Sequence, residues 1–290
     1  MDSLLVRTQR RWQIGIVAIF VCIYRPLVPI GHPVQSAALA ALKGGGSLNL
    51  GPLSYGTVEG AGKHPHGATH PTEMTMNETG RPDGYSTKPV EHVVKPFDSV
   101  DYADDDIVFS TLPSQLESAK LANNPDGWTE CILRGFTKRT ILSTPGFPRA
   151  LVRPPSLCYR IGPSDNGLGM FATCDLSMGD LIVTERPLMV TPRGLSIPTP
   201  IKLPVTFSAE QRRQAAIFEW EKMLQQCFDR MEPENQVAFM ELANSHLEDG
   251  SGPILGVIRT NGFEVGGLHD PTPEGEYTGV CKVISRINHR

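Results

Sequence analysis

The sequence lacks a hydrophobic run long enough to span a membrane. The longest one extends from Ile14 to Tyr24. As a helix it would reach about 16 Å, roughly half of the ~30 Å hydrocarbon core of a bilayer. Arg25 and Pro26 close it. A spanning helix is therefore not predicted, although a run of this length suits the hydrophobic part of a signal peptide.

Acidic residues are also missing from the N-terminal region, between Asp2 and Glu59. Such an absence is typical of an organellar transit peptide. Residues 1–42 thus form a basic and apolar N-terminus. Three interpretations are open for it: a secretory signal or membrane anchor within residues 7–24, a transit peptide, or an ordinary N-terminus.

The chain has no excess of positive charge and no closely spaced metal ligands. Its formal net charge is −4, so no general basic field attracts nucleic acid, and direct nucleic-acid binding is disfavoured. No two of the six cysteines have C-x-x-C spacing, which argues against a zinc site and favours reduced, buried thiols. The irregular spacing of His64, His66, His70 and His92 predicts no metal site either.

Periodicity is also absent from much of the N-terminal half. Residues 43–125 are rich in Gly, Pro, Thr and Asn, and no sustained helical or strand period is found between Gly44 and Pro96. Such a segment buries too little apolar surface to offset its ordering entropy. We therefore predict that residues 43–125 are a disordered, low-complexity region. Two local features stand out within it, the apolar Ile107-Val108-Phe109 and a short helix predicted from Ser114 to Ala122.

Residues 126–290 have the patterns of an α+β domain. Short strands are predicted at Tyr159–Ile161, Met170–Thr173, Leu181–Thr184 and Val280–Ile287, and Thr191–Pro204 is predicted to be a loop. Residues 128–155 carry isolated apolar anchors, which are typical of a lead-in that packs on a domain.

A helical insert is predicted over about residues 207–244. Ser208 and Gln211 form a capping box, and an apolar stripe follows at helical spacing at Ile217, Trp220, Leu224, Cys227 and Met231. A second helix starts at Pro233, with Val237 and Met240 on one face. The stretch from His246 to Gly250 is predicted to be a solvated loop. A further short helix spans Ile254–Arg259 and ends at a left-handed cap at Asn261-Gly262.

The stretch from Ser164 to Pro187 carries the strongest functional signal. Gly167 and Gly169 bracket Leu168 in a predicted tight turn, where missing side chains let the backbone approach a ligand. The letters G-L-G-M-F-A, D-L-S-M-G-D-L-I and E-R-P-L follow one another there. R-T-N-G-F occurs at Arg259–Phe263, and I-S-R-I-N-H occurs at Ile284–His289.

These stretches, in this order, resemble the SET domain, the fold of S-adenosylmethionine-dependent protein lysine methyltransferases. The long insert between them resembles the split SET domains of fungal proteins. The resemblance implies a SET-like domain of short strands with a helical insert. It also implies S-adenosylmethionine as the cofactor, held by Gly167, Leu168, Gly169, Asn261, Asn288 and His289. It implies a lysine in a histone or another protein as the substrate.

The resemblance stops inside the family motif N-H-S-C-x-P-N, because only Arg290 follows His289. The SET-like domain is thus expected to be incomplete at its C-terminus and inactive as written, and no catalytic residue can be named, since Tyr277 precedes the motif. The alternative is a non-catalytic remnant that binds a protein partner through the helical insert or the N-terminal half. A membrane-tethered protein is the third interpretation. The family's cofactor and reduced thiols favour the nucleus or cytoplasm over a secretory location.

Overall fold

A computed structural model describes the following residues of the chain: 81–82, 84–85, 102–114, 126–164, 167–193, 203–247, 249–265, 268 and 277–287. The predictions for residues 1–42 lie outside this part, as do those for most of residues 43–125. Within the described residues, no helix is long and apolar enough to cross a membrane.

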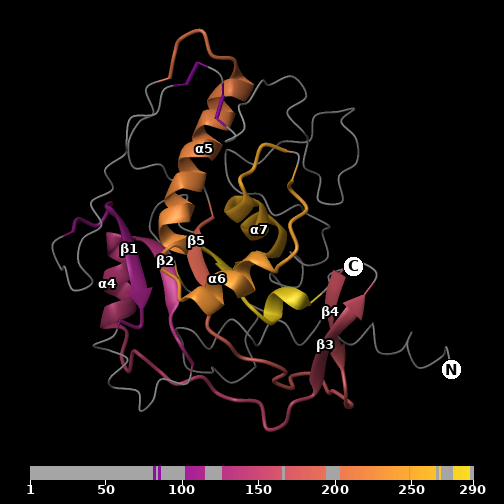
Figure 1. Ribbon diagram of the computed structural model, residues 1–290. Helices are drawn as coiled ribbons and strands as arrows, with labels where there is room; N and C mark the ends of the chain where they lie inside the picture. The colour runs from indigo at the N-terminus through magenta and orange to yellow at the C-terminus, as the bar shows by residue number, and fades with distance from the viewer. Residues whose placement is uncertain are drawn as a thin grey trace.

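A five-stranded sheet forms the centre of the fold (Figure 1). The strand order is β1-β2-β5-β7-β6, with β2 and β5 parallel and the other neighbours antiparallel. The strands are β1 Ile107–Leu112, β2 Thr129–Arg134, β5 Met189–Pro192, β6 Phe263–Glu264 and β7 Tyr277–Val280. A separate antiparallel hairpin consists of β3 Tyr159–Ser164 and β4 Gly167–Ala172.

Helices cover both faces of the sheet. Ile132 and Met189 point into a cluster with α5 Ala209–Phe228, α6 Pro233–Met240 and α7 Pro253–Asn261. Their neighbours Leu133 and Val190 point into a second cluster with α4 Gly135–Ser143. Successive side chains of a strand point to opposite faces, so both faces of the central strands are buried. The described part of the chain is therefore a layered α+β structure, as the patterns predicted.

The prediction for α5 is confirmed in detail. Gln211 N donates to Ser208 Oγ at 3.2 Å, and Ser208 N donates to Gln211 Oε1 at 2.9 Å, which completes the capping box. The predicted apolar stripe from Ile217 to Met231 is buried in the α5–α7 cluster. Burying such a side chain fully contributes about 1.5–3 kcal/mol, so the stripe fixes the face that α5 turns to the sheet.

A buried carboxylate joins α5 to α7. Glu221 accepts from Ile254 N at 2.8 Å and from Leu255 N at 2.9 Å, the unpaired donors of the first turn of α7. Burial raises the pKa of Glu221, and these two hydrogen bonds counteract the rise. The N-terminus of α7, which opens with Pro253, is thus stabilised by a side chain from another helix and not by a local cap.

Several strand predictions are wrong. Leu181–Thr184 is not a strand, and the strand in this region is Met189–Pro192, which begins before the predicted loop from Thr191. The predicted strand Val280–Ile287 is the end of β7 followed by the short 3-10 helix η5, Ile284–Arg286. Short apolar runs do not distinguish these states, because pairing with distant partners decides which run joins the sheet.

Residues that precede the predicted domain, or were predicted only to pack on its start, belong to the central sheet. Residues 107–112 form the edge strand β1, in register with residues 129–134 of β2. The boundary predicted at residue 125 therefore left a strand outside the domain. Likewise residues 128–155, predicted to be a wrapped lead-in, contribute β2 and α4.

Val237 and Met240 share one face of α6, as predicted, and this face is exposed. Val237 and Met240 are exposed by 59% and 47%, whereas Ala238 and Phe239 are buried. The helix ends at Met240, short of the predicted Asn244. With only two turns, α6 has too few residues for its periodicity to indicate which face is buried.

Candidate cofactor site

The three stretches that resemble SET motifs meet in one hydrophobic cluster. Met170 comes from G-L-G-M-F-A, Ile182 and Val183 from D-L-I-V, and Ile284 and Ile287 from I-S-R-I-N-H. Phe263, from R-T-N-G-F, packs against the same cluster. In Figure 1 the yellow C-terminal segment lies between the helices and the β3–β4 hairpin. Segments distant in sequence are thus packed around residues 281–287.

A half-buried glutamate holds η5 in place. Glu185 Oε1 accepts from Val283 N at 2.8 Å and from Ile284 N at 2.5 Å, across 98 and 99 residues of sequence. Burial raises the pKa of Glu185, and the backbone donors partly offset the rise. The carboxylate therefore satisfies N–H groups at the start of η5 that the helix itself leaves unpaired.

A serine links η5 to the end of α7. Ser285 Oγ accepts from Cys281 N at 3.1 Å and donates to the backbone oxygen of Asn261 at 3.2 Å. Asn261 is itself buried, and its Nδ2 donates to Ala243 O at 2.6 Å and to Val257 O at 2.8 Å. Both hydrogens of the amide are therefore used, and its oxygen is the group that can accept from a ligand.

The end of α7 differs from the predicted left-handed cap. Asn261 is the last residue of the helix, and Gly262 has φ −72° and ψ 136°, which is extended. A Cβ on Gly262 would lie 2.6 Å from Ile258 O and would also collide with Thr278. The glycine is required by the close approach of α7 to β7.

The glycine pair of the first stretch lies in a strand. Gly167 begins β4 with φ +98°, a conformation that favours glycine, and a Cβ there would meet no atom within 4 Å. Gly169 is buried opposite Gly162, and Leu168 is 44% exposed. Gly167, Leu168 and Gly169 therefore belong to a strand and not to the predicted tight turn, and Gly167 and Leu168 form its exposed start.

A disulfide closes the base of the hairpin, contrary to the prediction of reduced thiols. Cys158 and Cys174 are bonded across a sequence separation of 16. Cys131, Cys227 and Cys281 are buried and free, as predicted, and burial raises the pKa of each thiol. The spacing of the cysteines did not indicate this bond, because the two residues are brought together by the pairing of β3 with β4.

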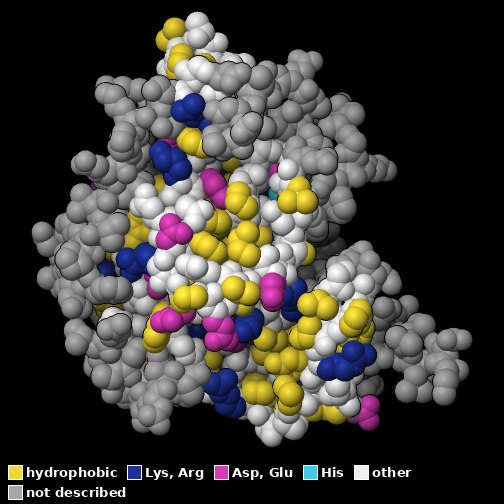
Figure 2. All heavy atoms as spheres, in the orientation of Figure 1, with side chains coloured by type: hydrophobic (Ala, Val, Ile, Leu, Met, Phe, Trp, Pro, Cys, Tyr) yellow, Lys and Arg dark blue, Asp and Glu magenta, His cyan; other side chains and the backbone are white. Residues whose placement is uncertain are grey.

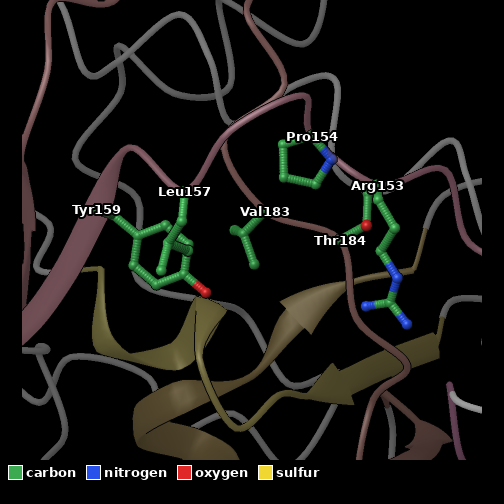
Figure 3. A pocket seen from close by; sticks show the side chains of 6 residues that line it. All are labelled: Arg153, Pro154, Leu157, Tyr159, Val183 and Thr184. Carbon is green, nitrogen blue, oxygen red and sulfur yellow. The ribbon is translucent and has the colours of Figure 1, made fainter.

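A small cavity lies beside the hairpin (Figure 3). Tyr159 and Leu157 line one side and Arg153 and Thr184 the other, with Val183 between them. Its volume is about 250 Å³, below the ~300–1,000 Å³ of typical small-molecule pockets. None of the glycines or Asn261 lines it, so this cavity is distinct from the residues that the resemblance implies.

The stretch predicted to be a solvated loop holds a buried ionic cluster. His246 Nδ1 and Arg259 Nη1 each lie 2.6 Å from Asp249 Oδ2, and Arg259 Nη1 lies 2.6 Å from Ser251 Oγ. All three charged or titratable side chains are buried. Ser251 contacts Arg259 rather than a histidine, so this is not a nucleophile–base arrangement. Its role is to fix the loop between α6 and α7.

Of the six predicted cofactor residues, four lie in the described part of the chain. The structure joins Asn261 and the hairpin that carries Gly167, Leu168 and Gly169 to the same segment, residues 281–287. Asn288 and His289 lie outside the described residues. Sequence analysis missed Glu185 and Ser285, whose only signal was their place inside the matching stretches. No family model, curated protein or solved structure significantly matches the chain.

Proposed function

We propose that this chain carries the cofactor-binding part of a SET-like protein lysine methyltransferase. The observation that carries the proposal is the packing of G-L-G-M-F-A, E-R-P-L and R-T-N-G-F around residues 281–287, which contain I-S-R-I. Collinear sequence motifs need not be neighbours in space. Here Glu185 and Ser285 connect two of them to η5 by hydrogen bonds, and Met170 connects the third by packing.

The described residues fit one end of such a cofactor. Gly167 leaves open space at an exposed strand start, and Asn261 keeps an amide oxygen whose nitrogen is already anchored. With Leu168, Gly169, Asn288 and His289 these residues would hold S-adenosylmethionine. When bound, that cofactor supplies a methyl group on a positively charged sulfur.

The acceptor lysine would have to be neutral. An unperturbed lysine has a pKa of ~10.4, so a site for methyl transfer must lower it by burial or by a nearby positive charge. Tyr277 does not contribute to such a site. It is fully buried, donates its hydroxyl hydrogen to Thr137 Oγ1 at 3.1 Å and accepts from Arg134 N at 3.1 Å. Its role is to join β7 to the start of α4.

Calorimetric titration of the full chain with S-adenosylmethionine tests the proposal. Gly167→Ala should weaken binding at least tenfold, because alanine disfavours the left-handed conformation and fills the open strand start. Gly179→Ala is a matched control, since Gly179 has φ +94° and equally open surroundings. Each substitution should cost about 1–2 kcal/mol of stability, but only the first should affect the titration.

Two outcomes would refute the proposal. One is the absence of saturable binding to wild type up to about 1 mM, the upper end of usual substrate constants. The other is equal weakening by both glycine substitutions, which would indicate a general loss of stability.

The exposure of Val237 and Met240 supports a second candidate, a module that binds a protein partner through the helical insert. Figure 2 shows apolar side chains gathered on this face of the molecule. Affinity capture with wild type and with the double variant Val237→Glu, Met240→Glu tests it. A partner retained by wild type and lost by the folded variant would favour this function, and equal capture would oppose it.

A further inference from the structure

A tight turn from the N-terminal half of the chain contacts α5. Residues 82–85 form this turn, in which Tyr85 N donates to Pro82 O at 3.1 Å and Gly84 has φ +77°. A positive φ at the third position of a turn favours glycine there. Pro82 and Tyr85 are both buried, and Tyr85 is only 7% exposed. In Figure 1 the short violet fragment lies beside the upper end of α5.

Aromatic rings hold the tyrosine from two directions. The Tyr85 ring centroid lies 6.4 Å from that of Phe218 in an edge-to-face arrangement and 6.5 Å from that of Phe207. Both distances suit favourable ring pairs. A Cβ on Gly84 would lie 3.8 Å from the Phe207 ring, so the turn passes close to the same ring.

The hydroxyl of Tyr85 meets a buried carboxylate. Tyr85 Oη donates to Glu219 Oε1 at 2.8 Å, and Lys222 Nζ lies 3.0 Å from Glu219 Oε2. The Glu219 side chain is only 4% exposed. A buried carboxylate is costly unless it is paired and hydrogen-bonded. Burial and the bond to Glu219 raise the pKa of Tyr85, which keeps the hydroxyl protonated as a donor.

This contact lies apart from the main core. Neither Tyr85 nor its ring partners Phe207 and Phe218 belong to the three hydrophobic clusters of the described residues. Among the described residues of this region, the turn and the Tyr85 side chain make the contact, and we expect it to open locally while the sheet and helices remain folded. Unlike a purely apolar contact, this one combines two flanking aromatic rings, a hydrogen bond from Tyr85 and the charged carboxylate of Glu219.

We propose that the face formed by Phe218, Glu219 and Lys222 of α5, with Phe207 from the segment just before α5, is a docking site for a tyrosine presented by a Pro-x-Gly-Tyr turn. The chain's own Tyr85 occupies this site and fastens the N-terminal half to the helical insert. The occupant belongs to the same chain as the site, so the site is filled at a high effective concentration. The inference is independent of the proposed cofactor site.

A labelled peptide of residues 79–88 provides the test, with the full-length chain as receptor. The peptide should bind the Tyr85→Ala chain at least tenfold more tightly than wild type, where the tethered turn competes. On the Tyr85→Ala chain, a peptide with Tyr85→Phe should bind at least fivefold more weakly. A phosphotyrosine peptide should bind more weakly still, because the phosphate removes the donor and repels Glu219.

A further substitution isolates the polar anchor. In the double variant Tyr85→Ala, Glu219→Leu the receptor has no acceptor, so the tyrosine and phenylalanine peptides should bind within twofold of each other. If Tyr85→Ala does not fold, judged by circular dichroism, the Tyr85→Phe chain replaces it. The tyrosine peptide should then bind this chain several-fold more tightly than wild type.

Three results would overturn the proposal. They are equal peptide binding to wild type and to the emptied receptor, no difference between tyrosine and phenylalanine peptides on that receptor, and no saturable binding to it up to about 1 mM. Tighter binding of the phosphotyrosine peptide would equally contradict the roles given to Glu219 and to the hydroxyl.

Discussion

Replacing Glu185 with alanine should destabilise the fold. The loss should be larger than for other carboxylates near the β3–β4 hairpin that accept a hydrogen bond from the backbone. The substitution leaves the backbone N–H groups of Val283 and Ile284 without their acceptor. Hydrogen bonds to a charged group are worth about 1.5–3 kcal/mol each, and an unsatisfied buried donor costs about 1–3 kcal/mol. Glu185 is partly accessible, so water can replace part of the loss. We therefore expect a net cost of about 3 kcal/mol.

Urea unfolding followed by circular dichroism measures this cost directly. The slope of the free energy of unfolding with urea should stay the same, and the midpoint should fall. Asp180→Ala is the matched control, because Asp180 also accepts a backbone N–H, that of Ser177 at 2.6 Å, but in an exposed turn. The control should cost at most about 1 kcal/mol. A Glu185→Ala cost equal to that of the control would refute the argument that η5 depends on this carboxylate.

Two further predictions concern other stabilising contacts. Burial alone would raise the pKa of Asp249, but His246 and Arg259 outweigh it and hold the pKa at about 2, below its ordinary 3.8. The stability that ionised Asp249 contributes to the folded state is thus fully present above pH 3.8 and is lost as pH falls toward 2. Asp249→Asn should lower the free energy of unfolding by about 3 kcal/mol at neutral pH. In urea unfolding, the difference in this free energy between wild type and variant should be smaller at pH 3. A difference that stays constant with pH would contradict the lowered pKa of Asp249. Reducing the Cys158–Cys174 bond, with a sequence separation of 16, should lower stability by about 3 kcal/mol. Thermal unfolding with and without reductant checks this, and Cys158→Ser should abolish the effect of reductant.

The helices could be predicted because their signals are local. The capping box at Ser208 and Gln211 and the stripe from Ile217 to Met231 lie within one continuous segment, and both are present in α5. A pattern of this length contains several turns, so its buried face can be deduced. The two-turn α6 does not contain enough residues for that deduction, and the apolar pair Val237 and Met240, predicted to lie on one face, is exposed.

The strands predicted at Tyr159–Ile161 and Met170–Thr173 correspond to β3 and β4. The central sheet and the buried charges could not be predicted, because distant partners determine them. Leu181–Thr184 and Met189–Pro192 are both short and apolar, but only the second lies between β2 and β7. Asp249 was predicted to be solvated because nothing in its neighbourhood reveals that Arg259 and His246 enclose it. The same holds for the pairing of Cys158 with Cys174, which follows from the register of β3 with β4.

The candidate site depends both on local sequence signals and on contacts between distant residues. Sequence order alone indicated which stretches belong together, and the structure gives the contacts by which three of them reach residues 281–287. These contacts are of different kinds: a carboxylate from Glu185, a hydroxyl bridge from Ser285 to Asn261, and packing by Met170. Because each can be removed separately, their effects on cofactor titration are separable from their effects on stability. A site assembled on this segment should lose affinity when Glu185 is removed, while Asp249→Asn should reduce stability by a similar amount and leave the affinity of the folded fraction unchanged.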